Sequence, residues 1–262
     1  MALTKEQIAG LSDALLEATR KSTPITNIVD QYPDITIEEA YEVQLQSYRT
    51  RIKNGDQVVG RKVGLSAKKM QEMFNVNEPV FGHIFASMMV PEGVPIPKSR
   101  LCKGVLEGEM AFVLKNDLKG PVTMAKVMAS IAGVIPAFEI ADTRCKEKPK
   151  KAQDIIADGS GGAMVMLGGQ FTPIDGIDLR QVGVILEKNG EVIATAAGVN
   201  VLGNPVQPIV ELVNKMAQYD IGLSTGEFII SGTPHPAASP QAGECYRVTF
   251  DHFGYVSIQF TD

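Results

Sequence analysis

The chain of 262 residues contains few cysteines and few histidines, three of each. The cysteines form no CxxC pair, and their odd number argues against a disulfide framework, so a reducing compartment is expected. The histidines stand in neither HxH nor HExxH spacing, which disfavours a zinc centre. The sequence therefore argues against a disulfide-rich scaffold and against a zinc site.

The sequence also lacks an excess of positive charge and any long apolar run. Its net charge of -5 argues against non-specific nucleic-acid binding, which needs a basic surface. No apolar stretch approaches the roughly 20 residues that span a bilayer. The opening residues, 1–20, mix both charges and show no basic segment followed by an apolar one, so no secretory leader is expected. We therefore expect a soluble, cytoplasmic protein that binds neither nucleic acid nor membrane.

What the sequence does contain is an ordinary globular composition, with 44% hydrophobic and 21% charged residues. Its first part is mainly helical. Thr4 with Gln7, and Thr36 with Glu39, have the spacing of capping boxes, and each precedes apolar residues at helical intervals. A third, short helix is predicted to begin at Ser66. The first 78 residues thus form a helical region that also contains one strand, over residues 58–65.

From residue 79 onward short β-type runs dominate the sequence. Asn189-Gly190 between two apolar runs predicts a type I′ hairpin, because both central residues of that turn need positive φ. A single later helix is predicted over 205–218. The fold class is α+β, with a mixed, β-rich body over 79–262 behind the helical region 1–78. The predicted strands of the body are 105–114, 133–141, 163–167, 182–187, 191–196, 227–231, 245–250 and 254–260.

The strand 105–114 is apolar yet carries two glutamates, Glu107 and Glu109. Side chains on a strand alternate between its faces, so the two carboxylates share one face. If that face is covered, the charges must be paired, neutralised or bound to a metal. The alternative is an edge strand whose glutamates face water.

A second apolar run, 134–142, contains the lone Glu139, and Asp158 opens a small-residue turn before a third run. Three glutamates from two β segments can supply the oxygens that Mg²⁺ or Mn²⁺ prefers. We favour this metal-binding interpretation over solvated or salt-bridged glutamates.

Basic residues occur in the predicted strand 58–65, where Arg61 and Lys62 point to opposite faces. A lysine beside an acidic metal site would bind an anionic substrate or transfer protons, and its alternative role is an ordinary ion pair. Residues 55–62 do not form a phosphate-binding loop, because no Ser or Thr follows Lys62. The basic segment 144–151 is expected to be a solvated surface or a lid.

The strings VVGRKVGLS, NEPVFGHIF, EGE, PAFEIADTR, ADGSGG, VLGNP and SGTP, in this order, resemble the 2-keto-4-pentenoate hydratase and 4-oxalocrotonate decarboxylase family of aromatic meta-cleavage pathways. The resemblance covers nearly the whole chain and implies a fumarylacetoacetate-hydrolase-like fold. It also implies that Glu107, Glu109 and Glu139 bind Mg²⁺ or Mn²⁺, and that the ion chelates the C1 carboxylate and 2-oxo group of the substrate. Lys62 would lie at the substrate, and Ser160 would line the same pocket.

The family contains two activities, and one motif separates this chain from the hydratases. Where hydratases commonly have EPDFG, the sequence here has EPVFG, with Val80 in place of the aspartate. An acid/base carboxylate for adding water is missing, and a valine favours a drier pocket that suits decarboxylation. The prediction is a lyase that converts 4-oxalocrotonate (2-oxo-3-hexenedioate) to 2-hydroxypenta-2,4-dienoate and CO₂.

Three alternatives remain open from the sequence: the hydratase itself, a C–C hydrolase of the fumarylacetoacetate type, and a non-catalytic metal or organic-acid binding protein. Lys62 is the candidate catalytic residue, and His235 is the candidate contact for the distal carboxylate. The family relationship also suggests a complex with a partner hydratase that takes over the dienol. The candidate substrate-binding residues are Leu65, Val80, Asp158, Ser160 and His235.

Overall fold

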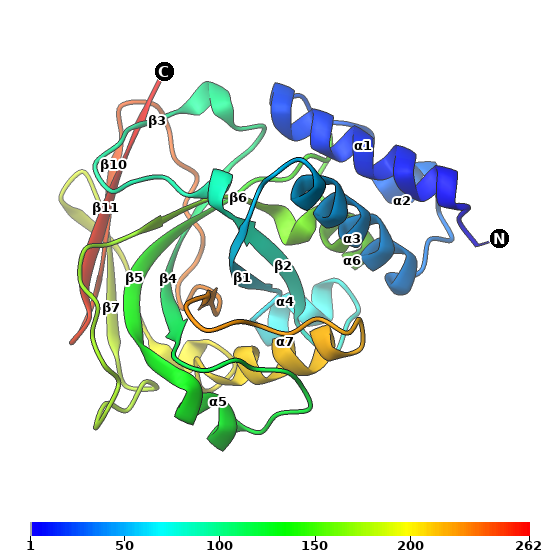
Figure 1. The fold of residues 1–262 in the computed structure, drawn as a ribbon. Coiled ribbons are helices and arrows are strands. Elements are labelled where there is room, and N and C mark those ends of the chain that lie inside the picture. Colours follow the sequence, from blue (N-terminus) through cyan, green and yellow to red (C-terminus); the bar gives the residue numbers. More distant parts are fainter. Residues whose placement is uncertain (1) are drawn as a thin grey trace.

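The computed structural model describes residues 2–262, and its N-terminal part is helical (Figure 1). Both predicted capping boxes are present: Thr4 Oγ1 accepts from the Gln7 N–H at 3.3 Å, and Thr36 Oγ1 accepts from the Glu39 N–H at 3.1 Å. These caps fix where the two long helices begin. The helices of this region are α1 (Lys5–Lys21), α2 (Ile28–Gln31) and α3 (Ile37–Lys53).

A six-stranded mixed sheet forms the centre of the molecule, in the order β2-β1-β9-β4-β5-β6. β1 is parallel to β9, and the other neighbours are antiparallel. β1 belongs to the predicted helical region 1–78, but it pairs with β2 and β9 of the predicted body 79–262. The predicted boundary at residues 78/79 therefore runs through this sheet. The strands are β1 (Val58–Gly64), β2 (Val80–Phe85), β4 (Val105–Leu114), β5 (Ile131–Ala141), β6 (Gly162–Leu167) and β9 (Phe228–Ile230).

A second, five-stranded sheet packs against β5 through β10 and β11. It contains the predicted hairpin, which joins β7 to β8. Asn189 and Gly190 have φ of 51° and 83°, which are the positive values that the predicted turn between β7 and β8 requires. Its strands, in spatial order, are β3 (Ile96–Pro97), β11 (Gly254–Thr261), β10 (Cys245–Phe250), β7 (Gly183–Lys188) and β8 (Glu191–Ala197).

Four shorter helices complete the fold. α4 follows β1 close to the predicted start at Ser66, and α7 matches the helix predicted over 205–218. α5 and α6 were not predicted. Both are short, and α6 depends on a distant contact, because Asp154 accepts from the backbone N–H of Val29 at 3.1 Å. These helices are α4 (Lys68–Met73), α5 (Met124–Ser130), α6 (Ala152–Ala157) and α7 (Gln207–Ala217). No helix within residues 2–262 has the length and apolar character to cross a membrane.

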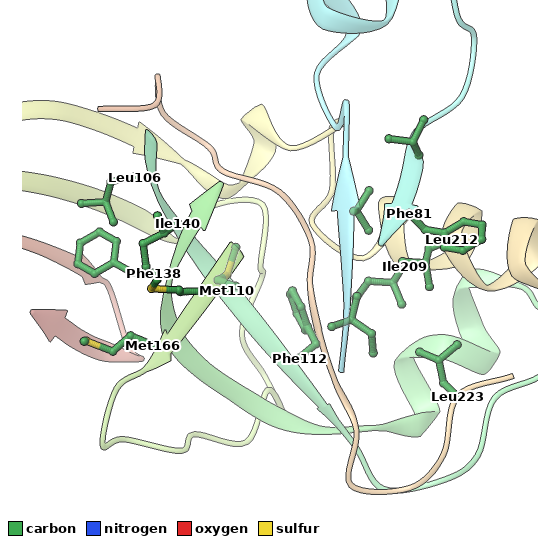
Figure 2. Packing of buried hydrophobic residues seen from close by; sticks show 14 of the residues in the cluster. Phe81, Leu106, Met110, Phe112, Phe138, Ile140, Met166, Ile209, Leu212 and Leu223 are labelled. Atoms are coloured by element: carbon green, nitrogen blue, oxygen red, sulfur yellow. The ribbon is translucent and has the colours of Figure 1, made fainter. Parts of the chain in front are cut away.

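The two faces of the six-stranded sheet carry different hydrophobic clusters. Met110, Phe138 and Phe112 lie in the large cluster shared with the second sheet, and Ile209 of α7 belongs to the same cluster (Figure 2). The opposite face of the same strands carries a smaller cluster that includes Ala111 and Ala137. Since side chains alternate along a strand, the odd-numbered glutamates of β4 share this second face.

Candidate metal centre and active site

The three predicted metal ligands lie together on the β4–β5 pair. Glu107 stands directly opposite Glu139 in the antiparallel register, and Glu109 stands opposite Ala137. One carboxylate oxygen from each glutamate lies within 4.8 Å of the others. Residues opposite each other in such a pair project from the same face, so the register itself produces the cluster. The edge-strand alternative is wrong, because β4 has β9 and β5 as neighbours.

Burial makes this cluster electrostatically unusual. Glu109 and Glu139 are 0% and 1% exposed, and Glu107 is half-buried. Burial, and then repulsion from Glu139, raises the pKa of Glu107 to about 7 against the attraction of Lys62. Burial raises the pKa of Glu109 well above its usual range, and the charges of Glu139 and Glu107 add to this effect. The surroundings therefore do not stabilise all three carboxylates in their charged form.

The free oxygens of this cluster fit a hard divalent cation. Glu109 Oε1 and Glu139 Oε2 are buried and have no hydrogen-bond partner. Such atoms are costly unless something binds them. The other oxygen of Glu109, Oε2, accepts the Gly232 N–H at 2.6 Å, which holds the carboxylate in place. An all-oxygen set suits Mg²⁺ or Mn²⁺, and Glu107, Glu109 and Glu139 could hold either ion.

Lys62 projects from β1 into the same cluster. Lys62 pairs with Ile230 of β9, and Ile230 stands opposite Ala111 of β4. Lys62 therefore projects from the same sheet face as the glutamates. Lys62 Nζ forms an ion pair with Glu139 Oε1, and the two side chains are 3% and 1% exposed. Burial alone would lower the pKa of Lys62, but Glu139 and then Glu107 outweigh it and raise the pKa above its usual value. Lys62 is therefore a buried ammonium group.

Arg61, one residue earlier, points away from this cluster, as strand alternation predicts. Its Nη1 lies 3.1 Å from Glu227 Oε2, and that pair is largely buried. Only one of the two adjacent basic residues of β1 thus belongs to the candidate site.

Ser160 lies in the turn between α6 and β6, and this turn packs against β1. It is 5% exposed, has a φ of 58°, and its Oγ has no hydrogen-bond partner. Gly64 makes room for it, because a Cβ there would lie 2.1 Å from Ser160 Oγ and 3.1 Å from Val80 Cγ2. Val80 is buried, and Leu65 is half-buried with a φ of 54°. Ser160, Val80 and Leu65 therefore surround the end of β1 close to Lys62.

Asp158 and His235, two further predicted substrate contacts, are engaged by the protein itself. Asp158 Oδ1 accepts from Arg144 Nε at 2.6 Å, and its Oδ2 accepts the Arg144 N–H at 2.8 Å. His235 Nε2 accepts the Gly108 N–H at 3.3 Å, and its Nδ1 donates to the Pro236 carbonyl at 2.9 Å. Burial also lowers the pKa of His235. Both side chains are therefore already hydrogen-bonded within the protein.

The turn that begins at Ser231 holds residues that the sequence interpretation missed. Ser231 is 0% exposed, and its Oγ has no partner. Gly232 has a φ of 106°, and a Cβ there would lie 1.9 Å from Ser66 Oγ, so only glycine fits at this position. In this conformation its N–H donates to Glu109. The string SGTP directly after a strand was the available signal, because a glycine there indicates close backbone approach.

Comparison with known proteins identifies the family of this chain. Residues 47–261 match the fumarylacetoacetate (FAA) hydrolase C-terminal domain. The chain belongs to the fumarylacetoacetate hydrolase family. The predicted resemblance and the α+β fold class with a helical N-terminal region are thereby confirmed.

The relatives compared below are named either as hydratases or as decarboxylases. The chain is 34% identical to 2-hydroxyhexa-2,4-dienoate hydratase of Comamonas testosteroni, over 98% of this chain and 99% of that protein. It is 31% identical to 4-oxalocrotonate decarboxylase of Pseudomonas sp. strain CF600, over 98% of both chains. Hydratases and decarboxylases are both lyases, which confirms the prediction of a lyase.

A solved structure of a decarboxylase resembles the whole chain. The 4-oxalocrotonate decarboxylase of Pseudomonas putida G7, complexed with magnesium and adipate, has a TM-score of 0.96 at 30% identity and covers 99% of both chains. The same enzyme was also solved with calcium and acetate, at a TM-score of 0.94. Both structures thus contain a divalent cation together with a carboxylate compound.

Proposed function

We propose that this protein is a metal-dependent 4-oxalocrotonate decarboxylase that forms 2-hydroxypenta-2,4-dienoate and CO₂. One observation carries the proposal: buried carboxylates with unpartnered oxygens, Glu109 and Glu139, lie beside the ammonium of Lys62. The likeness to a decarboxylase crystallised with magnesium and a dicarboxylate supports the choice of reaction and substrate class. The free cysteines agree with a reducing, cytoplasmic location.

Glu107, Glu109 and Glu139 would hold Mg²⁺ or Mn²⁺. When bound, the ion supplies Lewis-acid polarisation of the 2-oxo group. The chain itself keeps this centre in order, since Gly232 fixes one oxygen of Glu109 and leaves the other free. Apolar neighbours such as Ala111 and Ala137 on the same sheet face keep bulk water away.

Lys62 stabilises the charge that develops during bond cleavage. As the bond to the distal carboxyl carbon breaks, its electron pair passes through the C3–C4 double bond to the 2-oxo oxygen, and CO₂ leaves. One proton on that oxygen then completes the dienol. Lys62 is positively charged and adjacent to Glu139, so it can neutralise the enolate oxygen and donate that proton.

The remaining candidates bind and enclose the substrate. Ser160 Oγ is buried without a partner and can bond a substrate carboxylate oxygen. Val80 and Leu65 place apolar surface near Lys62, where a hydratase would need an acid or base for water. In this proposal Asp158 and His235 support the loops around the substrate, and His235 remains the candidate neighbour of the distal carboxylate.

A second candidate function is hydration of a 2-hydroxydienoate. It is favoured by the 34% identity to a named hydratase, which exceeds the 31% identity to a named decarboxylase. We place decarboxylation first because Val80 occupies the position of the hydratase aspartate.

The deciding experiment measures CO₂ release from 2-oxo-3-hexenedioate with Mg²⁺ or Mn²⁺, and again with a chelator. Glu109→Gln should abolish release, and the surface variant Glu191→Gln should leave it unchanged. Consumption of 2-hydroxypenta-2,4-dienoate without any CO₂ release would instead establish the hydratase. Metal binding with neither reaction would leave a binding protein.

We further propose a complex with a partner hydratase, since the dienol product is unstable and hydratases are its natural consumers. Mixing the purified protein with a candidate hydratase and measuring sedimentation tests this. Independent sedimentation of the two proteins at all ratios would refute it.

A further inference from the structure

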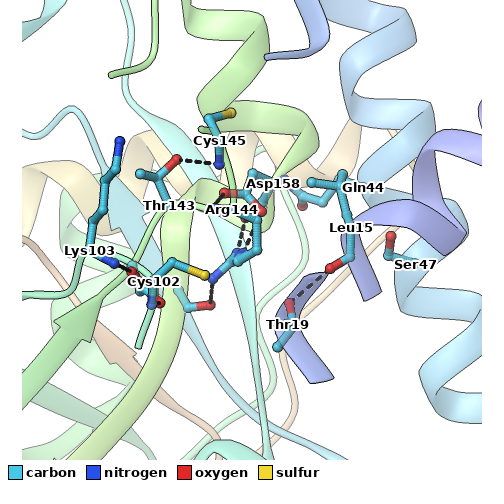
Figure 3. Close-up of polar contacts among 12 residues, drawn as sticks. Leu15, Thr19, Gln44, Ser47, Cys102, Lys103, Thr143, Arg144, Cys145 and Asp158 are labelled. Carbon is cyan, nitrogen blue, oxygen red and sulfur yellow. Dashed lines mark hydrogen bonds and ion pairs between the residues drawn. The ribbon is translucent and has the colours of Figure 1, made fainter. Parts of the chain in front are cut away.

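Arg144 lies where the sequence predicted a solvated surface or lid, yet it is buried. Its side chain is 7% exposed, and its guanidinium reaches the turn that carries Ser160 (Figure 3). Nε donates to Asp158 Oδ1 at 2.6 Å, Nη2 donates to the Asp158 carbonyl at 2.6 Å, and Nη1 donates to the Gly162 carbonyl at 3.0 Å. Arg144 thus binds the residues on both sides of Ser160.

The turn needs such support because its backbone is unusual. Gly159, Ser160 and Gly161 have φ values of 62°, 58° and 69°. Glycine adopts the left-handed region readily, but this conformation is unfavourable for the serine. Asp142 adds one bond, since its N–H donates to the Gly161 carbonyl at 2.7 Å. Side-chain and backbone bonds from the segment after β5 therefore hold this conformation.

The same turn packs against the stem of Lys62. A Cβ on Gly162 would lie 3.1 Å from Lys62 Cδ. A Cβ on Gly82 would lie 3.0 Å from Lys62 Cγ and 2.3 Å from the Gly159 carbonyl oxygen. The lysine stem therefore runs between the turn and β2. A shift of the turn would change where the ammonium meets Glu139.

We infer that Arg144 is a positioning residue, which sets the Ser160 hydroxyl and the Lys62 ammonium by clamping the turn 158–162. The role of those two groups in catalysis rests on the proposed function, but the clamp itself does not. A lysine at position 144 would keep the positive charge but not the planar fork that binds three acceptors. Arg144→Lys is therefore the variant that separates the geometry from the charge.

The first test needs neither substrate nor metal. Ser160→Cys is placed in a Cys102→Ser, Cys245→Ser background, and the rate of thiol labelling is measured. Cys145 remains as an internal reference, because it is 0% exposed and adjoins Arg144. Arg144→Lys should accelerate labelling of the introduced thiol at least about tenfold and leave Cys145 protected. Arg61→Lys, which alters another largely buried arginine outside the turn, should change neither rate.

Two outcomes of the labelling test would overturn the clamp. An unchanged labelling rate of the introduced thiol would mean that the turn keeps its conformation without the guanidinium. Equal acceleration at the introduced thiol and at Cys145 would mean that Arg144 only stabilises its own segment.

The second test uses whichever reaction the unmodified protein catalyses. Arg144→Lys should lower kcat about 10- to 100-fold, because small displacements of catalytic groups cost this much. It should raise KM as well, because the displaced Ser160 binds the substrate. Arg144 also lines a cavity of about 350 Å³, so guanidinium ion should enter Arg144→Ala and restore part of kcat. Unchanged kcat in Arg144→Lys refutes the positioning role. If the unmodified protein catalyses neither reaction, the proposed function fails and the labelling result still stands.

Discussion

Replacing Lys62 with methionine tests whether the ion pair with Glu139 is a buried charge pair. The two side chains are 3% and 1% exposed, so the variant leaves Glu139 without its counter-charge. Breaking a buried pair costs about 3–5 kcal/mol of unfolding free energy. The loss of Lys62 also removes an attraction that acts on the neighbouring Glu107.

The expected loss of stability therefore depends on pH in a defined direction. Lys62 holds the pKa of Glu107 down at about 7, so without Lys62 this pKa rises; above about pH 7 the folded variant keeps a proton that the unmodified protein has released, and the loss of stability grows with pH. Relative to the unmodified protein, Lys62→Met should lose about 3–5 kcal/mol at about pH 6 and more than that at about pH 8. Urea unfolding followed by circular dichroism, with chelator present, measures both values.

A matched control separates burial from simple loss of charge. Lys119 pairs with Asp220 at 2.7 Å, but the two side chains are 60% and 89% exposed. Lys119→Met should therefore cost less than about 1 kcal/mol at either pH. Equal losses for Lys62→Met at the two pH values, or a loss as small as that of the control, would refute the reasoning. Added Mg²⁺ should shrink the Lys62→Met penalty, because it supplies the missing positive charge.

Four further outcomes follow from the site and its surroundings. Gly64→Ala should reduce activity at least about tenfold, because its Cβ would lie 2.1 Å from Ser160 Oγ; an unchanged kcat contradicts the packing. Mg²⁺ should raise the Tm of the unmodified protein but not that of Glu109→Gln, as scanning calorimetry would show. Burial, and then the charge of Arg61, lowers the pKa of His83 well below 6.5. The free energy of unfolding should therefore fall as pH drops below about 6.5, and urea unfolding should show a weaker pH dependence for His83→Gln. Val80→Asp should raise hydration of 2-hydroxypenta-2,4-dienoate in an absorbance assay, and appreciable hydration without the substitution would count against Val80 as a determinant.

Local patterns were sufficient for part of the site. Alternation along 105–114 places Glu107 and Glu109 on one face in any strand, whatever the fold. The turn Asn189-Gly190 and the capping box at Thr36 are likewise local, since each is defined by neighbours three residues apart or fewer. These features could be predicted because their geometry does not depend on distant parts of the chain.

Other parts depend on contacts that a single sequence does not reveal. The approach of Lys62 to Glu139 requires β1 to pair in parallel with β9, which is more than 160 residues away in the chain. The same holds for the bond from Gly232 to Glu109 and for the Arg144 clamp. Arg144 is buried, whereas the lysines that follow it are exposed as predicted. α6 was missed because distant hydrogen bonds, and not its own sequence pattern, stabilise it.

The pairing of β4 with β5 has a consequence for folding. All three candidate ligands belong to this one antiparallel pair, with Glu107 opposite Glu139. A slip of one residue along β5 would turn Glu139 to the opposite face and away from its two companions. A divalent cation present during refolding would therefore bind only chains in the native register. Binding energy would then act as a selection for correct strand pairing, before any substrate is encountered.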